Sequence, residues 1–424
     1  MISFAHNPIL PEHIFVPDVE AHAWGDGRIY LYGSFDIKGK KSYCSTVHHV
    51  YSSDDLIHWV DHGVAFSIED STWAKDCGAL YAPDCAYRDG WYYLYYCVPD
   101  GRCGVAKSQS PTGPFTDVGQ IEGVLGIDPA AFIDDDGQAY LYWGQLTWCH
   151  AAKLKDNMVE IEQDTICTPL TVAEHEFHEG SSVKKVDGKY YYLFADTHRH
   201  GDPDKNEGRP SCLGYAVSDH PMHGFEYGGV IIDNFGCDPH VWNNHGSMEY
   251  FKGQWYVFYH RSTYGTEYSR HVCAEPIYFD TEGKIREVKQ TSSGIAPAIK
   301  ATEHLHASFA CEMRGNVRIA DDSEDAYDLI LDRISNGDSA TYRYLDFDGE
   351  DTFTIRMRSD ANCRVELYID GAYHTDFKVP VSEQSVQTTV RMPEITGRHT
   401  LTLSWYGNFS CASVQEFAFE KERA

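Results

Sequence analysis

Five short segments of the chain share one pattern of polar and hydrophobic positions. In each segment a polar residue and a glycine are followed by aromatic or aliphatic residues three and five positions after the glycine. The five copies are Gly27-Tyr30-Tyr32, Gly90-Tyr93-Tyr95, Gly137-Tyr140-Tyr142, Gly188-Tyr191-Leu193 and Gly253-Tyr256-Phe258. A polar residue before glycine favours a tight hairpin turn, and a period of two is that of a half-buried strand. Each copy therefore predicts one β-hairpin.

The spacing of these hairpins predicts the architecture. Successive glycines are 63, 47, 51 and 65 residues apart, which suits a four-stranded blade with loops of variable length better than a helical repeat. After the fifth hairpin the repeat ends, and shorter alternating runs such as 352–356 and 363–369 are typical of an antiparallel sandwich. We therefore expect an all-β chain: a five-bladed β-propeller catalytic domain at 1–300 and a C-terminal β-sandwich at 308–424.

A polar residue recurs about one strand length before each hairpin turn. Asp18, Asp84, Asp128, Glu179 and His245 stand 9, 6, 9, 9 and 8 residues before the respective glycines. The first strand of every propeller blade lines the central channel, so these side chains should converge at one mouth. Because burying so many like charges is costly unless chemistry or a cation requires them, we place the candidate active site there.

Carboxyl groups gathered in this way can hydrolyse a glycosidic bond with inversion. One carboxylate deprotonates water, and one carboxylic acid protonates the leaving oxygen, with roughly 6.5–9.5 Å between them. A third carboxylate beside the acid raises the pKa of the acid by repulsion. Asp18, Asp128 and Glu179 offer such a trio.

The segments around these acids resemble glycoside hydrolase family 43 over about residues 5–295. The motifs that carry the resemblance are Pro17-Asp18-Val19-Glu20-Ala21-His22, Ala82-Pro83-Asp84, Gly126-Ile127-Asp128-Pro129-Ala130, His178-Glu179-Gly180-Ser181 and Asn244-His245-Gly246-Ser247. The resemblance implies a five-bladed propeller and inverting hydrolysis, usually of arabinofuranosyl or xylosyl linkages. Where family members have Asp-Pro and Glu-Gly-Pro, this chain has Asp18-Val19 and Glu179-Gly180-Ser181, departures that bear on substrate more than on mechanism.

The resemblance also implies roles for single residues. Asp18 becomes the general base, Glu179 the general acid, and Asp128 the residue that modulates the pKa of the acid and orients it. Arg270 would contact the sugar near Asp128. His245 would match an axial histidine that holds a water or a calcium ion, so calcium bound through water at His245 is the one metal that we consider, and no cofactor is required.

Other candidate residues rest on position. Asp84 either binds substrate hydroxyls or satisfies backbone donors. Trp73 and Phe35 lie where loops would rim the channel, and each either stacks on a sugar or packs between blades. The C-terminal domain faintly resembles a family 6 carbohydrate-binding module through Ile334-Ser335-Asn336-Gly337-Asp338 and His399-Thr400-Leu401, and it binds sugar or braces the propeller.

The net charge and the cysteine content limit which partners and which cellular compartment fit this chain. The net charge of −29 argues against nucleic acid and anionic membranes as partners. The chain has no 18-residue apolar run and no signal-peptide pattern. Its thirteen cysteines lack zinc-site spacing, so we interpret them as free thiols and expect a cytoplasmic protein.

We therefore predict an exo-acting glycosidase, an α-L-arabinofuranosidase or β-xylosidase, whose partner is an oligosaccharide derived from (arabino)xylan or arabinan. Three alternatives remain: a non-catalytic sugar-binding propeller, a glycosidase of another sugar specificity, and a retaining invertase-like enzyme. The chain lacks the Asn-Asp-Pro-Asn-Gly start of the invertase-like group. The sequence separates neither arabinose from xylose nor one oligomeric state from another.

Overall fold

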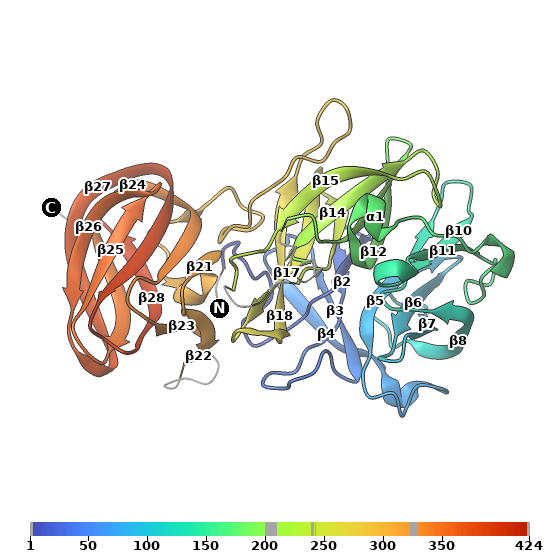
Figure 1. Cartoon of the computed structure of the whole chain (residues 1–424), viewed down its shortest axis with the longest axis horizontal. Helices are drawn as coiled ribbons and strands as arrows, with labels where there is room; N and C mark the ends of the chain where they lie inside the picture. The colour runs from blue at the N-terminus through green and yellow to red at the C-terminus, as the bar shows by residue number, and fades with distance from the viewer. Residues whose placement is uncertain (1–2, 200–209, 239–240, 242, 323–328, 422–424) are drawn as a thin grey trace.

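The computed structural model describes residues 3–199, 210–238, 241, 243–322 and 329–421, and two β-rich bodies follow one another along the chain (Figure 1). Within these residues the one α-helix is the short α1 (Val172–His175). Single 3₁₀ turns occur at Ile68–Asp70, Leu146–Trp148, Gln163–Thr165 and Ala307–Phe309. The expected all-β class is confirmed. Nowhere in the described ranges is there a helix long and apolar enough to cross a lipid bilayer.

Five antiparallel sheets in chain order form the larger body. Blade 1 contains β1 (Glu20–Ala23), β2 (Ile29–Tyr32), β3 (Val47–Ser53) and β4 (Trp59–Ser67). Blade 2 contains β5 (Tyr81–Arg88), β6 (Trp91–Cys97), β7 (Arg102–Ser108) and β8 (Thr116–Leu125). Blade 3 contains β9 (Ala130–Ile133), β10 (Ala139–Trp143) and β11 (His150–Leu154). Blade 4 contains β12 (Phe177–Val186), β13 (Lys189–Asp196), β14 (Cys212–Ser218) and β15 (Glu226–Asp233), and blade 5 contains β16 (Ser247–Phe251), β17 (Gln254–Thr263) and β18 (Thr266–Ile277).

Each predicted hairpin turn joins the first two strands of one blade. The five turn glycines have φ between 81° and 93°, the left-handed region that glycine enters without steric cost. The five-bladed propeller is thus confirmed. Blades 3 and 5 have three strands in the described residues rather than the expected four. An isolated bridge of Ala151 with Cys167 continues the pairing of blade 3, and one of Ile232 with Val288 adds to β15 at the edge of blade 4.

The first strand of each blade lies on the inside of the ring. β1 neighbours β5 and β16, and β9 and β12 complete the circle. The ring closes where the backbone N–H of Ala21 donates to Oγ of Ser247 (3.0 Å), and that hydroxyl donates to the carbonyl of Val19 (2.8 Å). Residues far apart in sequence therefore face one central channel.

The smaller body is one large, mainly antiparallel sheet in the order β22-β23-β28-β24-β27-β25-β26, to which β19, β20 and β21 add. Its strands are β19 (Ile299–Lys300), β20 (Leu305–His306), β21 (Glu312–Arg314), β22 (Arg318–Asp321), β23 (Leu329–Ile334), β24 (Ser339–Ser359), β25 (Cys363–Ile369), β26 (Ala372–Val379), β27 (Ser382–Gly407) and β28 (Ala412–Glu420). The strand at Ile299 begins this sheet, close to the expected end of the propeller at 300.

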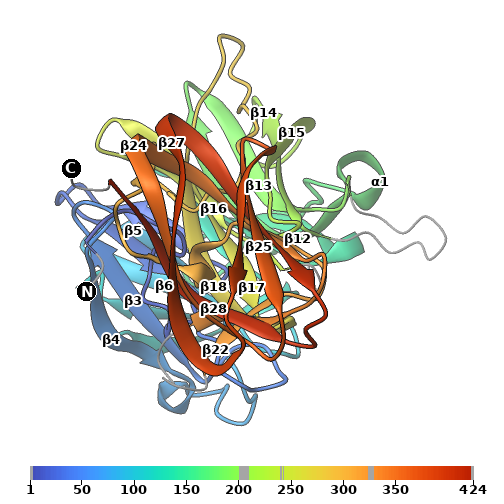
Figure 2. The ribbon, with the colours of Figure 1, turned by 90° about the vertical axis from the view of Figure 1, so that its left-hand side faces the viewer.

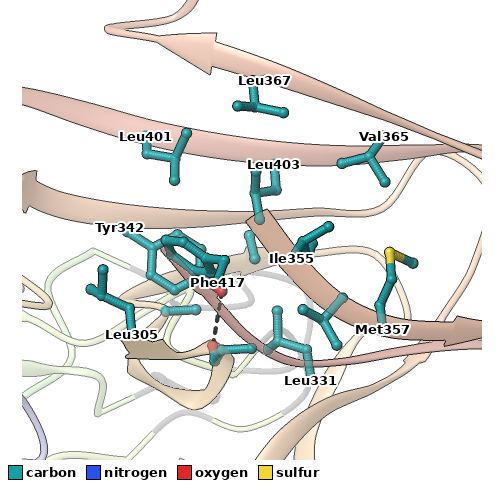
Figure 3. Packing of buried hydrophobic residues seen from close by; sticks show 14 of the residues in the cluster. Leu305, Leu331, Tyr342, Ile355, Met357, Val365, Leu367, Leu401, Leu403 and Phe417 are labelled. Atoms are coloured by element: carbon teal, nitrogen blue, oxygen red, sulfur yellow. Dashed lines mark hydrogen bonds between the residues drawn. The ribbon is translucent and has the colours of Figure 1, made fainter. Parts of the chain in front are cut away.

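One hydrophobic core fills the smaller body (Figure 3). Tyr342, Ile355, Leu403 and Phe417 come from different parts of the sheet, yet they belong to a single cluster. Because the cluster also includes Leu305 of β20, which pairs with β28 in the same sheet, the large sheet must curl around its own core. The expected sandwich thus takes the form of one continuous sheet, whose long strands β24 and β27 bend at register shifts.

The two bodies meet through buried polar contacts beside β17 and β18. Arg261 of β17 is buried and donates to the carbonyls of Ala310 (2.7 Å) and Ser308 (2.6 Å). The backbone N–H of Tyr264 donates to the carbonyl of Ile319 (2.7 Å). Figure 2, turned so that the smaller body faces the viewer, shows β24, β27 and β28 in front of these propeller strands. The smaller body therefore lies against the side of blade 5.

Candidate active site

A cavity of about 360 Å³ at the mouth of the channel brings together most of the predicted site residues. Asp18 and Asp128 come just before the inner strands β1 and β9, Glu179 lies in β12, His245 precedes β16, and Arg270 lies in β18. Four of these five residues come from the start of an inner strand, as the repeat predicted. The channel thus collects three carboxyl groups, one imidazole and one guanidinium.

Two of the three carboxyl groups are held by an unusual backbone conformation. Asp18 has φ of 56° and Asp128 has φ of 57°. This left-handed conformation costs a residue other than glycine roughly 1–2 kcal/mol, and such strain is common where a side chain must be aimed at a site. The backbone therefore turns both carboxyl groups into the cavity as the chain enters the blade.

Asp18 is held ionised by a buried arginine. Asp18 is only 6% exposed, and its Oδ1 accepts a hydrogen bond from Nη1 of Arg270 (2.8 Å). Burial alone would raise the pKa of Asp18, but the positive charge of Arg270 lowers it below the usual value. Arg270 is itself fixed by Asp36, whose carboxylate accepts from Nε (2.9 Å) and Nη2 (3.0 Å). The guanidinium of Arg270 therefore contacts both Asp18 and Asp36, and its contact with the sugar near Asp128 stays a prediction.

Asp128 has the opposite electrostatic character. It is 6% exposed, and its Oδ2 accepts from the backbone N–H of Gly180 (3.1 Å). Burial, with repulsion from Glu179 and Asp18, raises the pKa of Asp128 well above the usual value. The cavity therefore holds one carboxyl group that stays ionised and another that retains its proton more readily.

Glu179 is the most accessible of the three acids. Its side chain is 21% exposed, against 8% for Asp18 and 7% for Asp128. Its Oε2 accepts from Nε2 of Gln145 (2.6 Å), and the backbones of the two residues form an isolated bridge. The pairing of β12 with β13 shifts register on both sides of Glu179, and such bulges re-aim a side chain. Glu179 thus faces the open side of the cavity.

Two histidines pack against Asp18. Nδ1 of His245 lies 3.7 Å from Asp18 and 3.8 Å from Asp128, and Nδ1 of His260 lies 3.5 Å from Asp18. Burial lowers the pKa of both histidines, and with Arg270 it lowers that of His260 to about 3. Both imidazoles are therefore neutral near pH 7, and they fill the space behind the carboxylate without adding charge.

Asp84 does not join the other acids. Its Oδ1 lies 2.7 Å from Nε2 of His22, and its Oδ2 accepts from the backbone N–H of Ala131 (2.6 Å). Its offset of 6 residues from the turn glycine, against 9 for Asp18, moves it about 10 Å along its strand. The sequence predicted one cluster at the mouth, but the structure has a second one deeper in the channel. Asp84 satisfies backbone and imidazole groups there.

Among the described residues, this deeper cluster is the group whose side-chain ligand atoms lie close enough together to hold a metal ion. The ligand atoms of Glu20, His22 and Asp84 lie within 4.8 Å of one another. Nζ of Lys184 lies 3.3 Å from Nδ1 of His22 and donates to Glu249 (2.7 Å), so an ammonium group already balances these acids. Calcium prefers six to eight oxygen ligands, which neither this cluster nor the single nitrogen of His245 supplies. The residues present do not fit a directly ligated calcium ion, and calcium bound through water at His245 stays a prediction.

Trp73 and Phe35 pack between blades and do not line the cavity. The ring of Trp73 stacks on Tyr96, with 5.9 Å between centroids. Phe35 stacks on His49, with 4.6 Å between centroids. One face of each ring is therefore covered by another aromatic ring, and neither residue lines the cavity.

Several residues at the cavity escaped the sequence analysis. Asp36, Gln145 and His260 lie outside the first strands of the blades, and the hairpin repeat samples only those strands. Asp36 and Arg270 are 234 residues apart, so no local pattern links them. Asp36 and His260 lie behind the cavity wall, in contact with Arg270 and Asp18, whereas Gln145 lines the cavity. Other lining residues that the repeat did not single out include Tyr43, Cys44, Tyr81, Pro99, His178 and Asn243.

The sequence and the fold of this chain are similar to those of known proteins. The family model described as glycosyl hydrolases family 43 matches residues 5–285. A xylosidase/arabinosidase of Thermoclostridium stercorarium is 30% identical over 97% of this chain and 98% of its own. Among solved structures, an α-L-arabinofuranosidase from Clostridium thermocellum is 32% identical (TM-score 0.55, covering 66% of this chain and 95% of that one). A β-xylosidase/α-arabinofuranosidase from a compost metagenome, solved with xylotriose in a calcium-free form, is 29% identical (TM-score 0.58, 68% and 98%).

Proposed function

The chain belongs to family 43 of the glycosyl hydrolases, and we propose that it is an inverting exo-glycosidase that removes arabinofuranosyl or xylosyl units from (arabino)xylan or arabinan oligosaccharides. The chain is a glycoside hydrolase. The observation that carries it is the convergence of Asp18, Asp128 and Glu179 from three blades on one cavity.

Asp18 acts as the general base. The carboxylate is ionised because Arg270 lowers its pKa, so it can accept a proton from the water that attacks the anomeric carbon. One lone pair of Oδ1 is occupied by Arg270, which fixes the direction in which the carboxylate points. The attacking water then lies between Asp18 and the sugar, as inversion requires.

Glu179 acts as the general acid. Its side chain is the most exposed of the three acids, which suits a group that must meet the leaving oxygen at the open side of the cavity. Asp128 accepts from the N–H of Gly180, the residue next to Glu179, and so fixes the backbone from which the acid projects. As the resemblance implies, Asp128 both orients and modulates the acid.

The shape of the cavity supports exo action on a pentose. Its volume of about 360 Å³ is near the lower end of ligand pockets, which span about 300–1,000 Å³. A space of this size suits one terminal sugar. The names of the similar proteins, which combine xylosidase with arabinosidase activity, support the choice of pentose.

We also propose a cytoplasmic location. All thirteen cysteines lie in described residues, and none is paired in a disulfide. Free thiols in this number are typical of a reducing compartment. An enzyme there would act on imported oligosaccharides rather than on polymeric xylan.

Hydrolysis of p-nitrophenyl α-L-arabinofuranoside and p-nitrophenyl β-D-xylopyranoside, measured side by side for the wild type and Asp18→Ala, tests the proposal. We expect the wild type to cleave at least one substrate and the variant to lose that activity. The anomer first released, followed by NMR, should be inverted relative to the substrate. A folded wild type that cleaves neither substrate would remove the pentosidase assignment, and retention would remove the role of Asp18 as general base.

A further inference from the structure

A groove of about 900 Å³ lies between blades 4 and 5, at the end of the channel opposite the active-site cavity. Val186, the last residue of β12, borders this groove, whereas Glu179, near the start of the same strand, lines the active-site cavity. Strand geometry places these two residues roughly 20 Å apart. β16 runs the same way, from His245 just before it to Tyr250 beside the groove. The groove is therefore separate from the catalytic centre.

A row of aromatic rings forms one wall of the groove. Tyr250 and Trp255 are paired across the hairpin of β16 and β17, and their ring centroids are 5.5 Å apart. The ring of Phe279 lies 5.8 Å from that of Trp255 and 5.5 Å from that of Tyr191. Tyr250, at the outer end of the row, is 49% exposed. The row therefore extends from solvent into the groove and offers aromatic surface to a ligand.

The opposite wall of the groove is fixed in shape by buried phenol groups. The hydroxyl of Tyr191 donates to the carbonyl of Gly283 (2.6 Å), and the hydroxyl of Tyr215 accepts from the backbone N–H of Ile285 (3.0 Å). A Cβ added to Gly228 would lie 2.2 Å from the ring of Tyr215, so a glycine is needed where β15 passes that ring. Ligand sites are usually preformed in this way.

The charges around the groove favour a neutral ligand. Each of the three lysines among its lining residues is paired with a carboxylate: Lys185 with Asp134 (2.6 Å), Lys189 with Asp219 (2.6 Å) and Lys284 with Glu282 (3.3 Å). Further acids line the groove, namely Asp187, Glu226 and Asp280. An anionic ligand would meet repulsion from these acids, whereas hydroxyl groups can donate hydrogen bonds to carboxylates. A sugar, with apolar C–H faces and hydroxyl groups at its edge, matches an aromatic wall with an acidic rim.

We propose that this groove is a second carbohydrate-binding site that holds the interior of a pentose chain, with Tyr250 and Trp255 as the stacking surface. The inference rests on the proposed function for the kind of sugar. The groove has about 900 Å³ against about 360 Å³ for the active-site cavity, so it has room for several sugar units where the cavity suits one. Because the groove is remote from the three catalytic acids, it should contribute to binding of long chains and not to cleavage of small substrates.

Affinity electrophoresis in native gels that contain dissolved arabinoxylan tests the inference. The full chain with Asp18→Ala is the parent protein, because it leaves the polymer uncut. The active-site cavity takes chain ends, which are scarce in a polymer, so retardation reports binding to chain interiors. We expect arabinoxylan to retard the parent. Adding Tyr250→Ala should raise the apparent dissociation constant about tenfold, and Tyr250→Phe, which keeps an aromatic ring, should recover most of the loss.

Tyr278→Ala is the matched control, because Tyr278 is similarly exposed (53%), follows β18 in the same blade and does not line the groove. It should leave the retardation unchanged. With Asp18 intact, Tyr250→Ala should hydrolyse the p-nitrophenyl pentosides within twofold of the wild-type rate.

The outcomes separate this inference from the proposed function. A parent that arabinoxylan does not retard, equal retardation with Tyr250→Ala, or an equal loss with Tyr278→Ala would overturn the second site while the glycosidase function stands. Loss of p-nitrophenyl pentoside hydrolysis with Tyr250→Ala would overturn the separation of the groove from the catalytic centre. A wild type that cleaves neither p-nitrophenyl pentoside would overturn the pentosidase proposal, and Tyr250-dependent retardation would still establish the groove as a carbohydrate site.

Discussion

The pKa values of two neighbouring carboxyl groups in the cavity, those of Asp18 and Asp128, shift in opposite directions because the groups have different partners. Asp18 faces a guanidinium, which lowers its pKa in spite of burial. Asp128 faces Glu179 and accepts a single backbone hydrogen bond, so burial and repulsion raise its pKa. Because Arg270 contacts Asp18, that carboxyl group can act as a base, while the neighbouring Asp128 retains its proton more readily.

The pH dependence of activity should change when this arginine is replaced. Asp18 can act as base only above its pKa, so activity is lost as the pH falls through that value. Arg270→Gln removes the guanidinium that lowers the pKa of Asp18, so the loss should begin at a pH higher by roughly one unit or more. The measurement is the acidic limb of kcat/KM against pH.

Arg270→Lys is the control, because it keeps a positive charge but cannot bind Asp18 and Asp36 at once through a planar fork. Its acidic limb should lie between those of the wild type and Arg270→Gln. If both variants keep the wild-type limb while folded by circular dichroism, Arg270 does not set the ionisation of Asp18.

Replacing the general acid Glu179 should affect only substrates whose leaving group needs a proton. Glu179→Gln should lower kcat on oligosaccharides by about 10²–10⁴-fold, the usual contribution of general acid catalysis. A glycosyl fluoride of the pentose that the wild type releases needs no proton on its leaving group, so hydrolysis of the fluoride should persist. Asp18→Asn should lose both activities, since both substrates need an activated water. Wild-type turnover of the oligosaccharide by Glu179→Gln would rule out the role of acid.

Residues that occupy equivalent strand positions could be found from the sequence, and others could not. Asp18, Asp128, Glu179 and His245 share nearly the same offset from a hairpin glycine, and the structure brings them together. Asp84, with an offset three residues shorter than that of Asp18, lies in the deeper cluster. Asp36 and His260 act through tertiary contacts that no period in the sequence encodes.

At the scale of elements, the start of β16 connects strand pairing to the site. Gly246 lies between His245 and the first residue of that strand, and a Cβ added to it would be 1.9 Å from the carbonyl oxygen of Phe258 in β17. A backbone oxygen cannot move away without shifting the strand. The close approach of β16 to β17 therefore helps to fix where His245 stands.

Gly246→Ala should accordingly separate the two strands, with a loss of stability of about 1–3 kcal/mol and a drop in kcat as His245 moves from Asp18. Gly137→Ala is the control: its φ of 85° is strained for alanine, but no atom lies within 4 Å of the added Cβ. It should lose some stability and keep its activity. Urea unfolding and kcat should be measured for both variants. Wild-type activity in Gly246→Ala would show that the close approach of β16 to β17 does not fix the position of His245.

At the scale of the whole molecule, strand content could be predicted more readily than strand pairing. The alternating runs in the C-terminal region predicted strands, and the structure contains strands there. Alternation does not say which strands pair, and it slips wherever a strand bulges, as between Tyr342 and Leu345 in β24. That is why the run 352–356 looks like a separate short strand in the sequence but belongs to the long strand β24.

The two bodies should depend on each other through one buried arginine. Arg261 lies in the propeller strand β17, is 2% exposed, and donates to two backbone carbonyls, those of Ser308 and Ala310, in the segment that leads into the C-terminal sheet. Arg261→Met would leave both carbonyl oxygens buried without these donors, at a cost of about 1–3 kcal/mol each. We expect the wild type to unfold in one calorimetric transition and the variant to show two, because the bodies would then unfold separately.

The control for this experiment is Arg364→Met, in which the replaced side chain is 48% exposed and pairs with Glu366 inside the C-terminal sheet. A surface ion pair contributes about 0–1 kcal/mol, so this variant should keep a single transition near the wild-type temperature. If Arg261→Met also unfolds in one transition at the wild-type temperature, the bodies do not depend on this contact. A split confined to Arg261→Met would show that one buried side chain couples the propeller to the sheet, and would support a bracing role for the C-terminal body.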